Sequence, residues 1–497
     1  MPQFSEFAAL QEKLGSALAM NRPNSGAEHV LLVLPSFSIG ETVLSHYGPR
    51  VPALEHRYLN AVLILSRIAS CHMIYVCSKA PLPEVVDAYF NMMTPAVRDH
   101  ARRRFTLLTI PDQSYRPVAT KLIEDPVLLE TVRQAIAGRA AYIEPWNVTE
   151  NEVNLALALD VPINGCDPIL WPLGFKSAGR KLMRESRVPV PLGVEDVTSI
   201  GAVLDAIATI RAAKPNCAGV VVKHDNSVAG DGNAVLRFAG GDAAWRAKLD
   251  SLPEWYVSDL AKGGIVEELV SGRDFSSPSV QVDVQPGRIV NVLATHEQML
   301  GGEDGQVYMG CRFPAHPGYA LQLANYGDAI GRQLAAVGFI GRFSVDFAVV
   351  QDELGMWQVH ALEMNLRKGG TTHPYVALRH LVPGRYDFAT GRWVCDDNTE
   401  RCYVSTDNLV DASWLGLDPV RLLGELGHHD LLFNSTRRTG IVPHMLACLA
   451  VDGRYGVTAI GTSPRHAQDL FERTRAVTAA AATRRFGRCG DRPCHRP

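Results

Sequence analysis

The sequence predicts a parallel α/β domain, followed by an α+β region built from hairpins and by a small α+β domain. Three observations lead to this prediction. Residues 28–165 alternate strand-like runs with helical runs, which is typical of a parallel sheet. A β-branched run at 220–223 and an apolar run at 234–236 enclose a loop of small residues, which indicates a hairpin. A later strand-like run places Glu363 and Asn365 two residues apart.

The first region, residues 1–165, contains apolar runs short enough to be buried strands. The predicted strands are 30–34, 73–77 and 140–143, and the predicted helices are 57–69, 127–137 and 150–159. Strands that are buried on both faces of a parallel sheet have continuous apolar sequences, and the predicted strands have such sequences.

The predicted hairpin has the composition of a phosphate-binding lid. Its first strand ends in Lys223, and its loop contains Ser227, Gly230 and Gly232. Glycine and other small residues let backbone N–H groups approach phosphates, while the lysine supplies a point charge. Lys176, which opens a predicted helix, gives a second cation upstream.

An apolar run that ends in acidic residues follows the hairpin. Backbone groups of this run can recognise the edge of an adenine ring, and the carboxylate of Asp274 can accept hydrogen bonds from ribose hydroxyls. Each residue taken alone is also compatible with a solvated turn. The candidate nucleotide residues of this run are Glu267, Glu268, Leu269 and Val270.

Glu363 and Asn365 are candidate metal ligands. Alternation along a strand directs residues i and i+2 to the same face, and Asp346 is available from a neighbouring predicted strand. Three hard oxygen ligands suit Mg²⁺, which keeps part of its shell for water and phosphates. The alternative is an edge-strand glutamate beside a turn asparagine.

The residues after this pair form a candidate substrate loop. Arg367 and Lys368 can bind a carboxylate, and Gly369, Gly370 and Thr371 allow close approach of the backbone. A plain turn into a helix at 375–381 is the competing interpretation. His296, at the end of a predicted strand, can line the same pocket or serve a structural role.

Taken in chain order, these motifs resemble the ATP-grasp superfamily, in which ATP lies between two α+β subdomains. The resemblance implies that Lys176 and Lys223 contact phosphates and that Asp346, Glu363 and Asn365 bind the metal. Asp274 stands where many relatives have glutamate. D-alanine:D-alanine ligase has an arginine where this chain has Ser344, so that role passes to Arg342 or Arg367. The expected catalytic residues are therefore Arg367, Lys223 and Arg342.

Segments outside this core are similar to the pheganomycin-type peptide ligases over residues 28–472. The similar segments are 55–59, 102–105, 146–149 and 439–446. This resemblance implies a Rossmann-like pre-ATP-grasp domain at 1–165, an ATP-grasp domain at 166–395 and a small C-terminal domain at 396–475. Residues 476–497 are expected to be a disordered tail because their end is rich in arginine, glycine and proline.

The composition narrows the class of protein. A net charge of −3 over 497 residues gives no reason to expect nucleic acid or a membrane as partner. Ten cysteines without paired spacing indicate reduced thiols, and neither a membrane span nor a signal peptide is expected. A cytoplasmic location is predicted, and a homodimer is compatible with the sequence.

The resemblance implies an ADP-forming ligase that joins an amino-acid carboxylate to the amine of another amino acid or peptide, with a γ-glutamyl bond as one outcome. ATP and Mg²⁺ are the expected cofactors, with two ions and with Mn²⁺ as a substitute. An acyl phosphate is the expected intermediate, because a carboxylate is a poor acyl donor, and Arg367 with the N–H groups of Gly369 and Gly370 is expected to stabilise the later oxyanion. The alternatives are a small-molecule kinase or carboxylase on the same scaffold, and a non-catalytic nucleotide-binding regulator.

Overall fold

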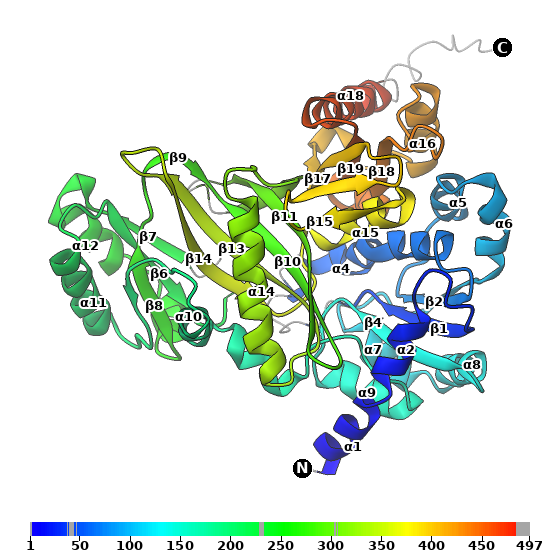
Figure 1. Cartoon of the computed structure of the whole chain (residues 1–497), viewed down its shortest axis with the longest axis horizontal. Coiled ribbons are helices and arrows are strands. Elements are labelled where there is room, and N and C mark those ends of the chain that lie inside the picture. The colour runs from blue at the N-terminus through cyan, green and yellow to red at the C-terminus, as the bar shows by residue number, and fades with distance from the viewer. Residues whose placement is uncertain are drawn as a thin grey trace, which may run out of the picture.

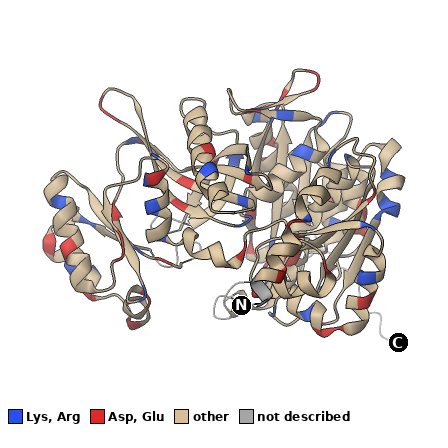
Figure 2. Cartoon of the chain, turned by 60° about the horizontal axis from the view of Figure 1, so that its bottom comes forward, with Lys and Arg blue, Asp and Glu red and all other residues tan. Residues whose placement is uncertain are grey.

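The computed structural model describes residues 2–36, 38, 44, 45, 47–227, 233–302, 305 and 307–483. These residues form three sheets with helices packed on them, as Figure 1 shows. Acidic and basic residues are interspersed over the part of the chain that the structure describes (Figure 2). No helix among the described residues is both long and apolar enough to cross a lipid bilayer.

The first sheet is parallel, with strand order β3-β2-β1-β4, as the sequence predicts. All six residues of β1 are buried, because helices cover both faces of the sheet. The strands are β1 His29–Leu34, β2 Cys71–Cys77, β3 Phe105–Thr109 and β4 Ala140–Pro145. The surrounding helices are α1 Pro2–Gln11, α2 Leu14–Met20, α5 Pro83–Asn91, α6 Pro95–Arg103, α7 Val118–Glu124, α8 Pro126–Ile136 and α9 Glu150–Leu159.

The segment predicted as an α-helix at 57–69 is a 3₁₀ helix, η2 Glu55–Ser66, preceded by α4 Val51–Leu54. Ten of its twelve residues are buried, so tertiary packing rather than helix propensity decides its geometry.

The second sheet carries the predicted phosphate hairpin. It is antiparallel, with order β5-β8-β6-β7, and the hairpin consists of β6 and β7. Its strands are β5 Gly193–Val194, β6 Gly219–His224, β7 Asn233–Arg237 and β8 Gly264–Glu268. Helices α11 Ile200–Ala213, α12 Asp242–Asp250 and α13 Glu254–Leu260 belong to this lobe, and α10 Lys176–Glu185 joins it to the rest of the chain.

The third sheet has eleven strands and includes the predicted metal strands. Its main order is β14-β13-β10-β11-β12-β17-β16-β15, with β9 beside β13 and with β19 pairing both β17 and β18. The strands are β9 Arg273–Ser276, β10 Pro278–Gln285, β11 Ile289–Gly301, β12 Val307–Phe313, β13 Gly341–Gln351, β14 Trp357–Asn365, β15 Gly384–Asp387, β16 Arg392–Cys395, β17 Glu400–Val410, β18 Gly440–His444 and β19 Arg454–Gly461.

One face of this sheet is covered by α14 Ala320–Ala336. A Cβ atom at Gly327 would lie 2.9 Å from Val280, which explains why the helix has glycine where it approaches the sheet. The opposite face carries the polar residues of the candidate site, and α15 Thr372–Leu381 packs there against η2.

The C-terminal strands continue this sheet instead of forming one of their own, because β17 pairs with β12. Helix α18 Pro464–Thr483 packs on these strands, and α16 Pro419–His428 packs against α18. The expected disorder is wrong for residues 476–483: α18 continues to Thr483, with Thr478, Ala481 and Ala482 buried. The remainder of the predicted tail, 484–497, lies outside the described residues.

Candidate active site

The three residues predicted to bind a metal lie together at the paired strands β13 and β14. Asp346 is paired in register with Glu363. Asn365 Nδ2 lies 3.3 Å from Asp346 Oδ2 and 3.4 Å from Glu363 Oε1. Turning the amide by 180° would direct its oxygen to the same space. The oxygen donors that Mg²⁺ prefers therefore converge at one point.

The charges of this cluster also fit a cation. Burial and the charge of Glu363 raise the pKa of Asp346. Burial opposes ionisation of Glu363 as well, but Lys176 and Lys223 outweigh it and lower the pKa of that carboxyl. Two adjacent carboxylates ionise together at low cost only when enough positive charge is near them. A divalent ion would supply this charge.

The two predicted phosphate lysines approach the same region from the second lobe. Lys176 Nζ lies 2.9 Å from Glu363 Oε2 and donates to the Ser227 carbonyl at 3.4 Å. Lys223 Nζ lies 2.5 Å from Glu267 Oε1. Both lysines are buried, so each needs an anionic partner, which a carboxylate supplies here.

The predicted adenine-binding run lies at the end of β8. The N–H groups of Glu268 and Leu269 already donate to the carbonyls of Leu192 and Gly219. The side chain of Glu268 is in an ion pair with Lys214. Two of the expected backbone donors are thus used within the sheet, and Val270 is the next residue along the chain.

The remaining residues that were predicted to bind the nucleotide have different environments. Ser227 follows the end of β6, and its Oγ donates a hydrogen bond to the His224 carbonyl at 3.3 Å. Asp274 is exposed at the start of β9 with a left-handed φ of 48°. Gly230 and Gly232 lie outside the described residues.

Most of the predicted substrate loop is committed to contacts within the protein. Lys368 is 3% exposed; its Nζ lies 2.9 Å from Glu144 Oε1 and donates to the Pro145 carbonyl at 2.5 Å. The N–H of Gly369 donates to Thr372 Oγ1 at 3.1 Å, which makes it part of the start of α15. Thr371 Oγ1 accepts a hydrogen bond from Gln281 Nε2 at 2.8 Å.

Gly370 is packed against an aromatic ring, since a Cβ atom there would lie 2.5 Å from Tyr308. His296 is also buried, and its Nε2 lies 2.6 Å from the Tyr403 hydroxyl. Burial lowers the pKa of His296 to about 3, so it is neutral. The structure gives His296 a packing environment inside the sheet.

The two predicted catalytic arginines have different charged neighbours. Arg367 is half-buried near the metal residues; burial lowers its pKa, while Glu363 and Asp346 act in the opposite direction. Arg342 precedes Asp346 by four residues on the same face of β13, a separation of about 13 Å at the rise of an extended strand. Of these two arginines, only Arg367 has the carboxylates of Asp346 and Glu363 among its charged neighbours.

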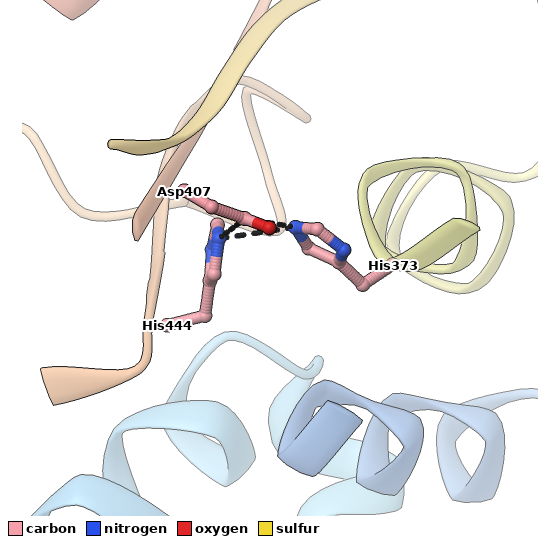
Figure 3. Close-up of side chains that lie close together, drawn as sticks. All are labelled: His373, Asp407 and His444. Carbon is pink, nitrogen blue, oxygen red and sulfur yellow. Dashed lines mark hydrogen bonds and ion pairs between the residues drawn. The ribbon is translucent and has the colours of Figure 1, made fainter. Parts of the chain in front are cut away.

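A buried cluster of His373, Asp407 and His444 lies beyond the substrate loop (Figure 3). The Nε2 atoms of the two histidines lie 3.0 and 2.8 Å from Asp407 Oδ1 and 3.0 Å from each other. Arg57 Nε lies 3.0 Å from the second carboxylate oxygen, Oδ2. Burial lowers the pKa of His373 to about 4, so this ring is neutral.

This spacing also suits a metal ion, but the charges and protons do not. Arg57 already neutralises Asp407, so a divalent ion would leave excess positive charge in a buried place. Binding through Nε2 would move each ring proton to Nδ1, and neither Nδ1 has an acceptor among the described residues. We interpret the cluster as a hydrogen-bonded ion pair that fastens α15 to β17 and β18.

Comparison with known proteins agrees with this architecture. The structure superposes on the ADP complex of N5-carboxyaminoimidazole ribonucleotide synthetase with a TM-score of 0.52, at 11% identity over 93% of this chain and 98% of that one. It also superposes on the biotin carboxylase domain of Hydrogenobacter thermophilus 2-oxoglutarate carboxylase, solved with MgADP, with a TM-score of 0.52 at 12% identity over 90% and 89% of the chains. The chain has the ATP-grasp fold.

Sequence comparison adds a relative of nearly equal length. The chain is 29% identical over 495 residues to L-propargylglycine–L-glutamate ligase of Streptantibioticus cattleyicolor, covering 95% of this chain and 98% of that protein. Residues 421–474 match the family model described as the PGM1 C-terminal domain. The similarity thus extends beyond the strands and helices of the ATP-grasp core.

Two contacts of the candidate site were not predicted from the sequence. Gln298 Nε2 donates to Asp346 Oδ1 at 2.6 Å. The alternation of β11 offered a signal, because His296 is paired with the residue opposite Asp346 and Gln298 is two positions further on the same face. Arg180 Nη1, 2.8 Å from Glu267 Oε2, lies one turn after Lys176 on α10 and could have been found from helical spacing.

Proposed function

We propose that this protein is an ATP-dependent ligase that forms an amide bond between the carboxylate of one amino acid and the amine of another amino acid or a peptide. The observation that carries the proposal is the convergence of Asp346, Glu363 and Asn365 with Lys176. The near full-length similarity to an enzyme named for joining two amino acids supports it. The proposed products are ADP, phosphate and the amide.

Each part of the site has a proposed task. Lys176 and Lys223 would bind the ATP phosphates, and the run Glu267, Glu268, Leu269 and Val270 would hold the adenine, with Val270 supplying the backbone donor. Asp346, Glu363 and Asn365 would hold Mg²⁺, which when bound neutralises phosphate charge and orients the γ-phosphate. Ser227 and Asp274 remain candidates for the phosphate and ribose positions.

The reaction needs no nucleophilic side chain from the protein. A carboxylate oxygen of the first amino acid attacks the γ-phosphorus of ATP, and ADP leaves, so the product is an acyl phosphate. The amine of the second substrate, after losing a proton, attacks the acyl carbon, and phosphate leaves. Arg367 is the proposed donor to the acyl phosphate and to the oxyanion that follows, since fixed cationic donors stabilise such charge.

L-Glutamate is the proposed first amino acid to test, because it occurs in the name of the full-length relative. Activation of its side-chain carboxylate would give a γ-glutamyl product, and activation of its α-carboxylate would give an ordinary peptide.

The experiment is a release assay for ADP with pairs of amino acids, read together with mass spectrometry of the product. The proposal expects ADP only when a carboxylate and an amine substrate are both present, with a product heavier by one residue. ADP formed with a single substrate, accompanied by a phosphorylated product, would contradict it in favour of a kinase. Tight nucleotide binding without turnover for any pair would favour a regulator.

A further inference from the structure

A cavity separate from the metal residues lies between the N-terminal region and the large sheet. Its volume is about 840 Å³, and its lining comes from η2, β4, β10, β11, β13 and α15. We call it the arginine chamber. Its lining includes Arg342, Arg379, Arg67, Asp283, Tyr58 and Trp393.

The chamber shares a sheet face with the metal residues but is walled off from them. Arg342 and Asp283 are register partners at one end of this face, and Asp346 lies four residues further along β13. The hydrogen bond from Gln281 to Thr371 and the ion pair between Lys368 and Glu144 lie between the two ends. Contacts of the substrate loop therefore separate the chamber from the metal residues.

Several residues that line this chamber have buried polar atoms without partners. Arg342 Nε and Nη1 have no hydrogen-bond acceptor among the described residues, and neither Asn164 Oδ1 nor Trp393 Nε1 has a partner there. Removing a guanidinium group from water without giving it a hydrogen-bond acceptor raises the free energy of the folded protein. Burial opposes the charge of Arg342, yet Tyr58, Asp283 and Glu144 outweigh this and raise its pKa, so the group stays charged.

The charges of the lining residues indicate which kind of ligand could bind in the chamber. Five arginines line the cavity against two acidic residues, Glu144 and Asp283, and Glu144 is already paired with Lys368. The excess positive charge favours an anion. Asp283 is the remaining acid, opposite Arg342 in the sheet. A cation and an anion on adjacent strands suit a molecule that carries both charges.

We propose that the arginine chamber binds a free amino acid, with its carboxylate at Arg342 and its ammonium group at Asp283. The choice of an amino acid rests on the proposed ligase function. Arg342 lies about 13 Å from Asp346 along β13, with the contacts of the substrate loop between them, so the carboxylate it binds is not the one that is phosphorylated. The chamber is thus a second amino-acid site, separate from the metal residues.

The test is calorimetric binding of the twenty L-amino acids to the full-length, nucleotide-free protein. L-Glutamate is also compared with glutarate, which lacks the α-amine. We expect Arg342→Gln to weaken both glutamate and glutarate about tenfold or more, because each loses a charge-assisted hydrogen bond. Asp283→Asn should weaken L-glutamate by a similar factor and leave glutarate nearly unchanged. Arg332→Gln, at an exposed residue of α14, is the matched control and should change neither.

Folding is checked by thermal unfolding of each variant. Arg342→Gln keeps hydrogen-bonding atoms at this position and is expected to fold. Arg342→Lys, which keeps the charge, is the second variant and should recover part of the binding. No saturable binding of any amino acid to the wild type would overturn the proposal, as would unchanged binding in Arg342→Gln or binding of inorganic phosphate alone. The outcome is independent of the ADP assay, because no nucleotide is present.

Discussion

Lys176 Nζ lies 2.9 Å from Glu363 Oε2, which joins the first turn of α10 to the strand that carries the proposed metal ligands. The lysine belongs to the helix that begins the nucleotide lobe, and the glutamate to the large sheet. This ion pair connects the two halves of the site across their boundary. It also keeps Glu363 ionised while Asp346 is protonated more readily.

Replacing a proposed metal ligand should abolish turnover and leave the fold intact. Glu363→Gln removes one charge, and Asn365→Ala removes one oxygen donor. Metal-assisted phosphoryl transfer supplies several kcal/mol of transition-state stabilisation, so either rate should fall by orders of magnitude. ADP release at saturating Mg²⁺ measures the rate, with thermal unfolding as the fold control. Glu400→Gln, an exposed glutamate paired with Arg392, should behave as wild type. Wild-type rates in Glu363→Gln would remove the metal assignment.

Arg367→Ala should lower turnover about 10²–10³-fold with little change in ATP affinity, because one fixed donor to an oxyanion contributes this much. Arg367→Lys should recover only part of the rate, since an ammonium group cannot reproduce the planar guanidinium fork. Turnover is measured by ADP release and ATP affinity by calorimetry, with Arg332→Ala as the surface control. A loss of ATP binding with an unchanged rate at saturating ATP would instead make Arg367 a phosphate anchor.

The stability of the N-terminal region should depend on pH through Glu55. Burial raises the pKa of this carboxyl to about 7, although Ser78 and Lys121 act in the opposite direction. The folded protein therefore binds this proton more tightly than the unfolded chain does. The resulting contribution to the free energy of unfolding is fully present below about pH 4.5 and is lost as the pH rises through about 7.

The size of this effect is on the order of 3 kcal/mol, from about 1.4 kcal/mol for each pH unit between the two pKa values. Denaturant unfolding of wild type and Glu55→Gln between pH 5 and pH 8 measures it. The difference in stability between the two should shift by this amount in favour of the variant as the pH rises. Glu124→Gln, at an exposed ion pair, serves as the control. A constant difference across this range would show that Glu55 titrates normally.

Asp407→Asn should destabilise the protein by about 3–5 kcal/mol, because it leaves the Arg57 guanidinium without its buried counter-charge. Asp397→Asn breaks the exposed pair with Arg438 and should cost less than about 1 kcal/mol. Chemical unfolding measures both. Metal analysis of the purified wild type accompanies this experiment, and one equivalent of a transition metal that is lost in Asp407→Asn would replace the ion-pair interpretation.

The sequence predicted the parts of the site that depend on local geometry. Glu363 and Asn365 share a face because strand alternation is a local rule, and the partner strand with Asp346 was recognisable by its own pattern. The parallel N-terminal sheet followed from continuous apolar runs, and the ATP-grasp fold from the order of the motifs. These predictions about the fold were confirmed.

The sequence could not predict contacts between distant segments. Lys368 was predicted to bind substrate because the sequence does not show its ion pair with Glu144. That partner lies more than two hundred positions upstream. His373, Asp407 and His444 come from three separate elements and share no spacing motif. The 3₁₀ geometry of residues 55–66 depends on the burial of this segment. That burial comes from tertiary contacts, including those with α15, which the local sequence does not show.

The pairing of β17 with β12 has a consequence for attempts to divide the chain. A truncation at residue 395, the proposed boundary, would strip β12 of its neighbour and leave a row of unsatisfied backbone groups at an open sheet edge. Open edges recruit strands from other molecules, so the shortened protein is expected to aggregate even though each proposed ATP and metal ligand is retained. Adding residues 396–483 as a separate polypeptide should restore solubility by strand complementation, because those residues supply the missing edge.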